Sequence, residues 1–173
     1  VKPSEVTPLV GKAVEDLFRD AGLPEGVFQV VQGPGAVGQA LIDARPDKIF
    51  FTGGTPTGRR IMEAASKHLI PVVLELGGKD PMIVCADANL DRATDAAVWG
   101  CFTNAGQVCA SVKRVLVAEE IADKFTAEVV RKTKALRLGD PMDPEVQIGS
   151  LTCKMQLDRI EEQVKSALRE GAT

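Results

Sequence analysis

Short apolar runs alternate with helical patterns over the first part of the chain, and this alternation limits the possible folds more than any other feature. Three β-rich runs lie at residues 27–31, 47–52 and 71–76. A segment with helical periodicity separates each run from the next. Strands joined through helices pair in parallel, with helices covering both faces of the sheet. The pattern predicts an α/β protein with a Rossmann-like, mostly parallel sheet that binds ligands at the carboxyl ends of its strands.

Proline and glycine residues mark where the helices begin and end. Thr7 followed by Pro8 starts a helix that Gly22 ends. The further expected elements are helices over residues 35–44, 55–68, 90–104, 121–134 and 157–170, and strands over 82–84 and 111–118. The order of elements changes beyond Gly77, so we expect two parts, residues 1–76 and 77–173.

Charge and composition exclude several kinds of partner. The net charge is −3, and the Lys and Arg residues are dispersed, so no basic surface for nucleic acid is expected. Four scattered cysteines and one histidine offer no zinc ligand set and indicate a reducing, cytoplasmic setting. No apolar run approaches the roughly 20 residues of a membrane span. The sequence predicts a soluble protein with no metal site and no nucleic-acid or membrane partner.

Two glycine-rich turns each join an expected strand to a helix. Residues 33–38 read Gly-x-Gly-x-x-Gly, and residues 51–58 read Phe-Thr-Gly-Gly-Thr-Pro-Thr-Gly. Backbone amides at such helix starts hold phosphate groups. The acid that usually binds the ribose is missing after the first turn, which also fits a tight turn without a ligand. Glu5, with Lys2, is the candidate acid, although both also fit solvated charges at a helix start.

Glu75 and Cys109 carry the candidate chemistry. Glu75 interrupts an apolar strand, where burial would desolvate a carboxylate and make it a stronger base. Cys109 follows Gly106 and Gln107 in a polar loop that small electrophiles can reach. From the local sequence alone a buried, unreactive cysteine is the commoner alternative, and we expect that state for the other three cysteines, which are Cys85, Cys101 and Cys153.

Taken together, these motifs resemble the aldehyde dehydrogenase superfamily. Five motifs occur in the family's order: Lys-Pro-Ser-Glu at 2–5, Gly-x-Gly at 33–35, Phe-Thr-Gly-x-Thr-x-x-Gly at 51–58, Glu-Leu-Gly-Gly-Lys at 75–79 and Gly-Gln-x-Cys at 106–109. The resemblance implies NAD(P)-dependent oxidation of an aldehyde to a carboxylic acid. Cys109 would form a thiohemiacetal, hydride would pass to the nicotinamide, and water activated by Glu75 would hydrolyse the thioester.

The resemblance also implies the cofactor contacts. Lys2 and Glu5 match residues at the adenosine ribose, Gly53 and Gly54 those beside the pyrophosphate, and Leu76 and Gly77 those near the nicotinamide; Ser4, Gly35, Gly38 and Thr52 complete the set. The acid Glu5 disfavours a 2′-phosphate, so NAD is expected over NADP, although Lys2 would offset the repulsion. Gly54 replaces the serine of many relatives and removes one hydroxyl contact to phosphate.

The implied domains are incomplete. Residues 1–76 would form part of an NAD(P)-binding domain, and residues 77–173 the N-terminal part of the thiol-bearing catalytic domain. The family's other segments would supply an oxyanion-hole asparagine, whose loss costs about 10²–10³ in rate. We therefore expect an internal fragment with little activity by itself, and a homo-oligomer. The alternatives are a non-catalytic nucleotide-binding module and a coenzyme A-acylating relative, which the presence of Glu75 disfavours.

Overall fold

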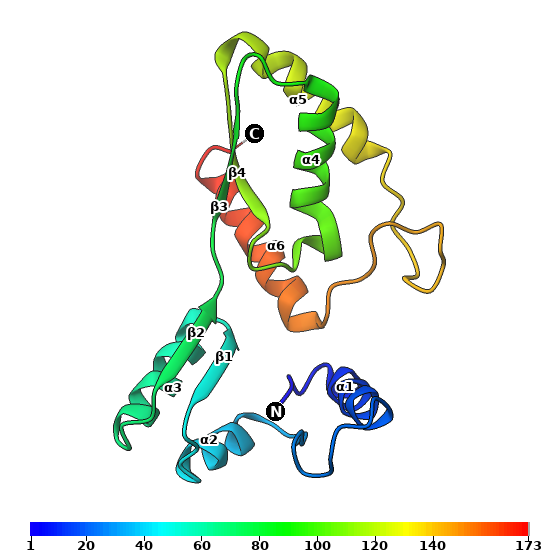
Figure 1. The fold of residues 1–173 in the computed structure, drawn as a ribbon. Helices are drawn as coiled ribbons and strands as arrows, with labels where there is room; N and C mark the ends of the chain where they lie inside the picture. The colour runs from blue at the N-terminus through cyan, green and yellow to red at the C-terminus, as the bar shows by residue number, and fades with distance from the viewer. Residues whose placement is uncertain (173) are drawn as a thin grey trace. The chain divides into compact units, whose positions relative to one another are not determined.

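The computed structural model describes residues 1–172 and divides into two compact units, Val1–Leu76 and Gly77–Thr173. Each unit contains one pair of parallel strands with helices packed beside it (Figure 1). This arrangement confirms the predicted α/β class with parallel strands. The units divide where the two parts of the chain were expected to meet, and their assignment as cofactor and catalytic domains remains a prediction.

The first unit contains three helices and one parallel strand pair. Its elements are α1 (Pro8–Asp20), α2 (Gly35–Asp43), β1 (Ile49–Gly53), α3 (Thr55–Ser66) and β2 (Val72–Leu76). The two strands pair in an unbroken register from Ile49↔Val72 to Gly53↔Leu76, so they end at the same edge. This edge is the carboxyl edge at which the sequence places ligands.

Helices α2 and α3 pack on one face of this strand pair. The core consists of Ile42, Ala65 and Ile70, with Ile49, Ile61, Ala64 and Val72 packed against them. Helix α3 approaches closely at Gly58, where an added Cβ would lie 2.9 Å from Leu76 Cδ2. The opposite face leaves Phe50 73% exposed, so the expected helical cover is present on one face among residues 1–172.

The expected strand at residues 27–31 is wrong, because this run has no strand ladder. Val31 N donates to the carbonyl of Val1 at 2.9 Å, and the amino group of Val1 donates to the carbonyl of Gln29. These bonds tie the run to the first residue of the chain rather than to β1 or β2. An extended run becomes a strand only when a partner supplies a hydrogen-bonded ladder.

The second unit contains the other strand pair and three helices. Its elements are β3 (Asp80–Val84), α4 (Leu90–Phe102), the 3₁₀ turn η1 (Thr103–Gly106), β4 (Val112–Val117), α5 (Glu119–Lys134) and α6 (Lys154–Arg169). The helix expected over 90–104 ends two residues early, at Phe102. The last helix starts at Lys154, three residues before the expected start.

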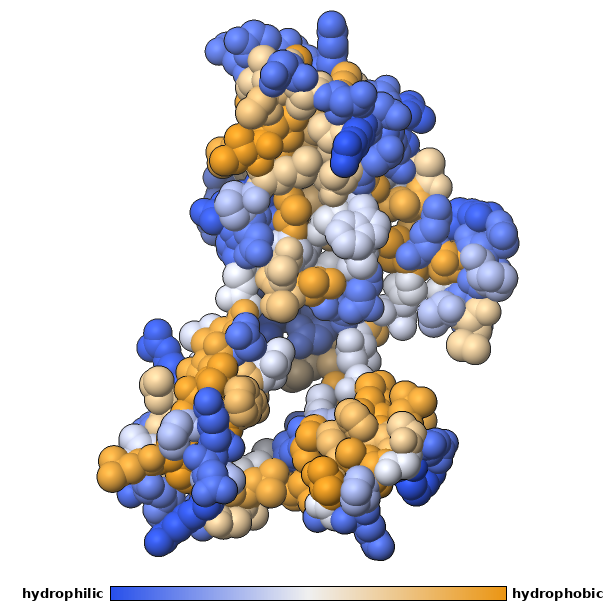
Figure 2. Space-filling model, viewed as in Figure 1, coloured by the Kyte–Doolittle hydropathy of each residue, from blue (hydrophilic) through white to orange (hydrophobic). Residues whose placement is uncertain are grey.

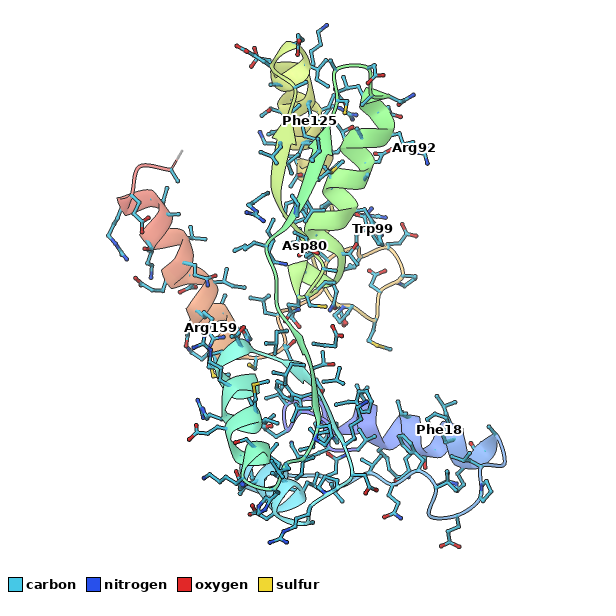
Figure 3. The ribbon with its side chains drawn as sticks, turned by 60° about the vertical axis from the view of Figure 1, so that its left-hand side comes forward. Phe18, Asp80, Arg92, Trp99, Phe125 and Arg159 are labelled. Carbon is cyan, nitrogen blue, oxygen red and sulfur yellow. The ribbon has the colours of Figure 1, made fainter. Side chains whose placement is uncertain are left out.

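Helices α4 and α5 pack together beside the β3–β4 pair. Val84, Ala97 and Phe125 form the buried core, and Figure 3 shows Phe125 on α5. Lys132 Nζ lies 2.6 Å from carboxylate oxygens of both Asp91 and Asp95, which joins α5 to α4. Apolar packing and these ion pairs therefore both hold α5 against α4.

Large apolar side chains remain on the surface of both units. Large apolar side chains with high exposed fractions include Leu9 at 80%, Phe50 at 73%, Trp99 at 72% and Leu168 at 62%. Figure 2 shows apolar residues on the visible face. Within residues 1–172, no helix has the length and apolar character that a bilayer crossing requires. Exposed apolar side chains are typical of association interfaces where they form contiguous patches.

Substitution of Phe125 tests the core of the second unit. Phe125→Ala removes a ring that is 4% exposed and is expected to lower the free energy of unfolding by about 3–5 kcal/mol, the usual cost of truncating a buried aromatic residue. Leu116→Ala, at a β4 side chain that is 58% exposed, is the control and should cost well under about 1 kcal/mol. Urea unfolding followed by Trp99 fluorescence measures both. Equal losses would contradict the assignment of the core.

Candidate active site

The carboxyl edge of the β1–β2 pair brings four predicted site residues together. The register pairs Thr52 with Glu75 and Gly53 with Leu76. Helix α3 begins two residues after Gly53, and no side chain caps its first N–H groups. Uncapped N–H groups at a helix start attract anions. Thr52, Gly53 and Gly54 thus lie where a phosphate group can be held.

The expected burial of Glu75 is wrong for residues 1–172, because its side chain is exposed. Side chains alternate along β2, and Leu74 and Leu76 both lie close to Gly58 of α3, within 3.6 Å of the position of an added Cβ. Glu75 therefore points to the other face of the strand pair.

Lys2 brings the N-terminal motif to the first glycine turn. Its Nζ donates to the carbonyls of Pro3 and Gly33, both at 2.8 Å, and lies 3.8 Å from Glu5 Oε2. The Lys2 side chain also passes Gly38, where an added Cβ would lie 3.7 Å from Lys2 Cε. The structure therefore brings Lys2 and Glu5 next to Gly33 and Gly38, which lie about thirty residues further along the chain.

The first glycine turn leaves room for a ligand at the start of α2. Gly35 opens the helix without a side-chain cap, and an added Cβ there would meet no atom within 4 Å. Gly33 has a φ of +145°, and an added Cβ would lie 2.4 Å from Val37 Cγ2, so only glycine fits. Ser4 Oγ accepts from Val6 N at 3.4 Å and therefore supports the local turn. An open helix start beside a carboxylate and an ammonium suits a nucleotide.

Cys109 lies in an exposed turn between η1 and β4. The turn follows three consecutive left-handed residues, Asn104, Ala105 and Gly106, with φ of 53°, 55° and 73°. A left-handed conformation costs an L-residue with a Cβ about 1–2 kcal/mol. Such strain persists only where the surroundings impose it, and it is concentrated at functional sites.

The backbone on both sides of Cys109 is held in place. Lys113 Nζ donates to the carbonyls of Val108 at 3.0 Å and Ser111 at 3.1 Å. Ser111 is buried, and its hydroxyl donates to the carbonyl of Gly100 at 2.9 Å. An added Cβ at Gly78 would lie 3.6 Å from the Cys109 carbonyl oxygen, which places Gly78 beside the cysteine backbone. The thiol thus projects from a fixed loop.

The other cysteines differ in their surroundings. Cys101 is half-buried, and burial raises the pKa of its thiol, which the nearby Lys113 ammonium only partly offsets. Cys153 is also half-buried. The expectation of a buried Cys85 is wrong: Cys85 follows the last residue of β3 in an exposed turn, outside the core that Val84 enters. Exposure alone therefore does not distinguish Cys109, whereas its fixed loop does.

Two residues that contact this loop region, Lys113 and Thr152, carry no local sequence signal. Gln107 accepts hydrogen bonds from Thr152, 45 residues away, and Lys113 folds back onto the carbonyls beside Cys109. Gln107 was visible only as part of the Gly-Gln-x-Cys motif. Side-chain to backbone contacts over such separations leave no periodic pattern, so the sequence identified neither Lys113 nor Thr152.

Metal binding has no support in the part of the chain that the structure describes. Among residues 1–172, no group of three or more His, Cys, Asp or Glu side chains is placed to hold a metal ion.

Leu76 is half-buried against α3, and Gly77 is exposed, with no atom within 4 Å of an added Cβ. The chemistry available is that of a thiol, a carboxylate and backbone amides.

Thiol labelling tests the contrast between Cys109 and Cys101. At pH 7.5, iodoacetamide is expected to modify Cys101 about tenfold or more slowly than Cys109, because a raised pKa and partial burial reduce the exposed thiolate. Cys85 is the exposed internal reference. Peptide mass spectrometry over time measures each rate. Modification of Cys101 at the rate of Cys109 would contradict the assigned environments.

Comparison with known proteins places the chain in a family. The aldehyde dehydrogenase family matches residues 1–173. A betaine aldehyde dehydrogenase of Cereibacter sphaeroides is 47% identical over 171 residues, covering 98% of this chain and 35% of that protein. A 4,4'-diapolycopene aldehyde oxidase of Methylomonas sp is 46% identical over 172 residues, covering 99% and 32%.

Solved structures agree with this result. The crystal structure of betaine aldehyde dehydrogenase from Staphylococcus aureus in complex with NAD+ has a TM-score of 0.92 at 37% identity, and the match covers 99% of this chain and 34% of that chain. The chain spans about a third of the length of the curated relatives it matches. Because the family pattern extends over every residue, the chain belongs to the aldehyde dehydrogenase family.

Proposed function

We propose that this chain carries the nucleophile, the base and part of the nucleotide site of an NAD-dependent aldehyde dehydrogenase, with Cys109 as nucleophile and Glu75 as base. The observation that carries the proposal is the exposed thiol of Cys109 on a loop whose flanking carbonyls are held by Lys113. Gly78, beside the Cys109 backbone, belongs to the same five-residue motif as Glu75. Family membership supports both roles.

The reaction follows from the chemistry of these groups. The Cys109 thiolate attacks the aldehyde carbonyl carbon and forms a C–S bond, and the carbonyl oxygen takes a proton to give a thiohemiacetal. NAD held beside Gly53 and Gly54 would supply the hydride acceptor for oxidation of the carbon bonded to Cys109 to a thioester, with loss of the hydroxyl proton to solvent. Glu75 then takes a proton from a water molecule that attacks the thioester, the C–S bond breaks, and the carboxylic acid leaves.

Support for NAD comes from the first unit. Glu5 is more than half exposed and is free to accept hydrogen bonds from ribose hydroxyls, while the uncapped starts of α2 and α3 offer N–H groups to phosphates. We propose Thr52, Gly53 and Gly54 beside the pyrophosphate, and Leu76 and Gly77 near the nicotinamide. A relative of solved structure is described as a complex with NAD+.

The proposed substrate class is an aldehyde, without a narrower choice. The names of the relatives include betaine aldehyde and a carotenoid aldehyde, which share only the reacting group. We also propose a homo-oligomer in the cytoplasm. Exposed apolar side chains such as Leu9 and Phe50 and four free thiols support these two proposals.

Pre-steady-state kinetics tests the two catalytic roles in the intact dehydrogenase. Cys109→Ala is expected to abolish NADH formation, because it removes the thiol proposed to hold the substrate carbon. Glu75→Gln should retain a first-turnover burst of NADH and lose about 10²-fold or more of the steady-state rate, since only thioester hydrolysis needs the base. Cys85→Ala is the control and should leave both phases unchanged. Equal loss of both phases in Glu75→Gln would exclude the proposed division of roles.

Cofactor selectivity tests the role of Glu5. Glu5→Gln removes a carboxylate that would repel a 2′-phosphate, and is expected to shift the ratio of kcat/KM for NAD over NADP by about tenfold towards NADP. Glu25→Gln, at another exposed acid of the first unit, should not alter the ratio. A ratio unaffected by Glu5→Gln would place the ribose elsewhere.

A further inference from the structure

Gln107 contacts both sides of the turn that precedes Cys109. Its Nε2 donates to the carbonyl of Asn104 at 3.1 Å, and its backbone N–H donates to the same oxygen at 3.1 Å. In return, Asn104 Nδ2 donates to the carbonyl of Gln107 at 3.3 Å. These three bonds close the left-handed turn formed by Asn104, Ala105 and Gly106.

The other end of the Gln107 amide contacts a distant segment. Gln107 Oε1 accepts from the backbone N–H of Thr152 at 2.9 Å and from its hydroxyl at 2.6 Å. A backbone N–H can only donate and a backbone carbonyl can only accept, so the partners at the two ends fix the orientation of the amide. One side chain therefore binds the strained turn on one side and the segment leading into α6 on the other.

Little else joins these two segments. A cavity of about 270 Å³ lies between them, lined by Asn104, Ala105, Pro141, Val146, Gln147, Gly149 and Ser150. Among residues 1–172, the hydrogen bonds between the turn at 103–107 and the segment at 139–153 are those from Thr152 to Gln107. Beside a cavity, loss of these bonds cannot be replaced by close packing.

We propose that Gln107 is a positioning residue, which together with Thr152 sets the conformation of the Cys109 loop and so the direction in which the thiol attacks the aldehyde. The catalytic part of this inference rests on the proposed function. Asparagine is one methylene too short to reach both partners. Glutamate lacks the amide donor and would set a carboxylate against the Asn104 carbonyl. The site thus requires a glutamine two residues before the nucleophile.

We call the hydrogen bonds of Gln107 to Asn104 and Thr152 the clamp. Hydrogen exchange tests the clamp without reference to activity. Thr152→Val removes the hydroxyl bond but keeps the shape of the side chain, and is expected to accelerate amide exchange in residues 103–111 about fivefold, the factor corresponding to about one net hydrogen bond. Gln107→Glu should have an equal or larger effect. Thr152→Ser restores the hydroxyl and should exchange like the wild type. The controls Thr126→Val and Gln163→Glu change exposed residues on α5 and α6 and should leave this peptide unchanged.

Kinetics of the intact dehydrogenase tests the positioning role. Thr152→Val and Gln107→Glu should lower the rate of the NADH burst about tenfold while leaving the KM for NAD unchanged, because a misdirected thiol slows attack but not cofactor binding. Thr152→Ser should recover the burst rate. Faster exchange with an unchanged burst would overturn the positioning role, and unchanged exchange would overturn the clamp. A wild-type enzyme without a Cys109-dependent burst would refute the proposed function, and exchange in the 103–111 peptide would still decide whether the clamp exists.

Discussion

Parallel pairing of β1 with β2 is the constraint on which the first unit depends. The unbroken register from Ile49↔Val72 to Gly53↔Leu76 makes both strands end together, so the chain must leave and re-enter the pair through helices. Helix α3 can lie close enough to make that connection because Gly58 has no side chain to meet Leu76. One edge consequently carries both the start of an uncapped helix and the carboxylate of Glu75.

In the second unit, a glycine likewise allows close packing next to the loop of Cys109, the proposed nucleophile. An added Cβ at Gly100 would lie 2.8 Å from Val112 Cγ2, so glycine allows α4 to pack directly on β4. The short connection between these two elements is then compressed into a left-handed turn and the loop of Cys109. Lys113 and Gln107 hold the loop by donating to backbone carbonyls, and Gln107 also accepts from Thr152. Cys109 itself remains exposed.

Local chemistry explains which features the sequence could predict. Pro8 and the glycine turns mark helix starts within the segment itself, and helices α1, α2 and α3 lie where they were expected. Among residues 1–172, the run at 27–31 forms no strand ladder, which periodicity cannot reveal. The same limit applies to the candidate site. The neighbours of Cys109 and its motif singled it out, whereas the bonds from Lys113 to the flanking carbonyls and from Thr152 to Gln107 join residues that only the fold brings together.

Glu75, the proposed base, shows how the environment of a side chain can depend on more than its own strand. A carboxylate acts as a base near neutral pH when burial and its neighbours adjust its affinity for protons. Strand alternation places Glu75 on the same face as Phe50, and that face leaves Phe50 73% exposed. Parallel strands are usually covered on both faces. A layer packed on this face would remove the apolar ring from water and cover the Glu75 side chain in the same step.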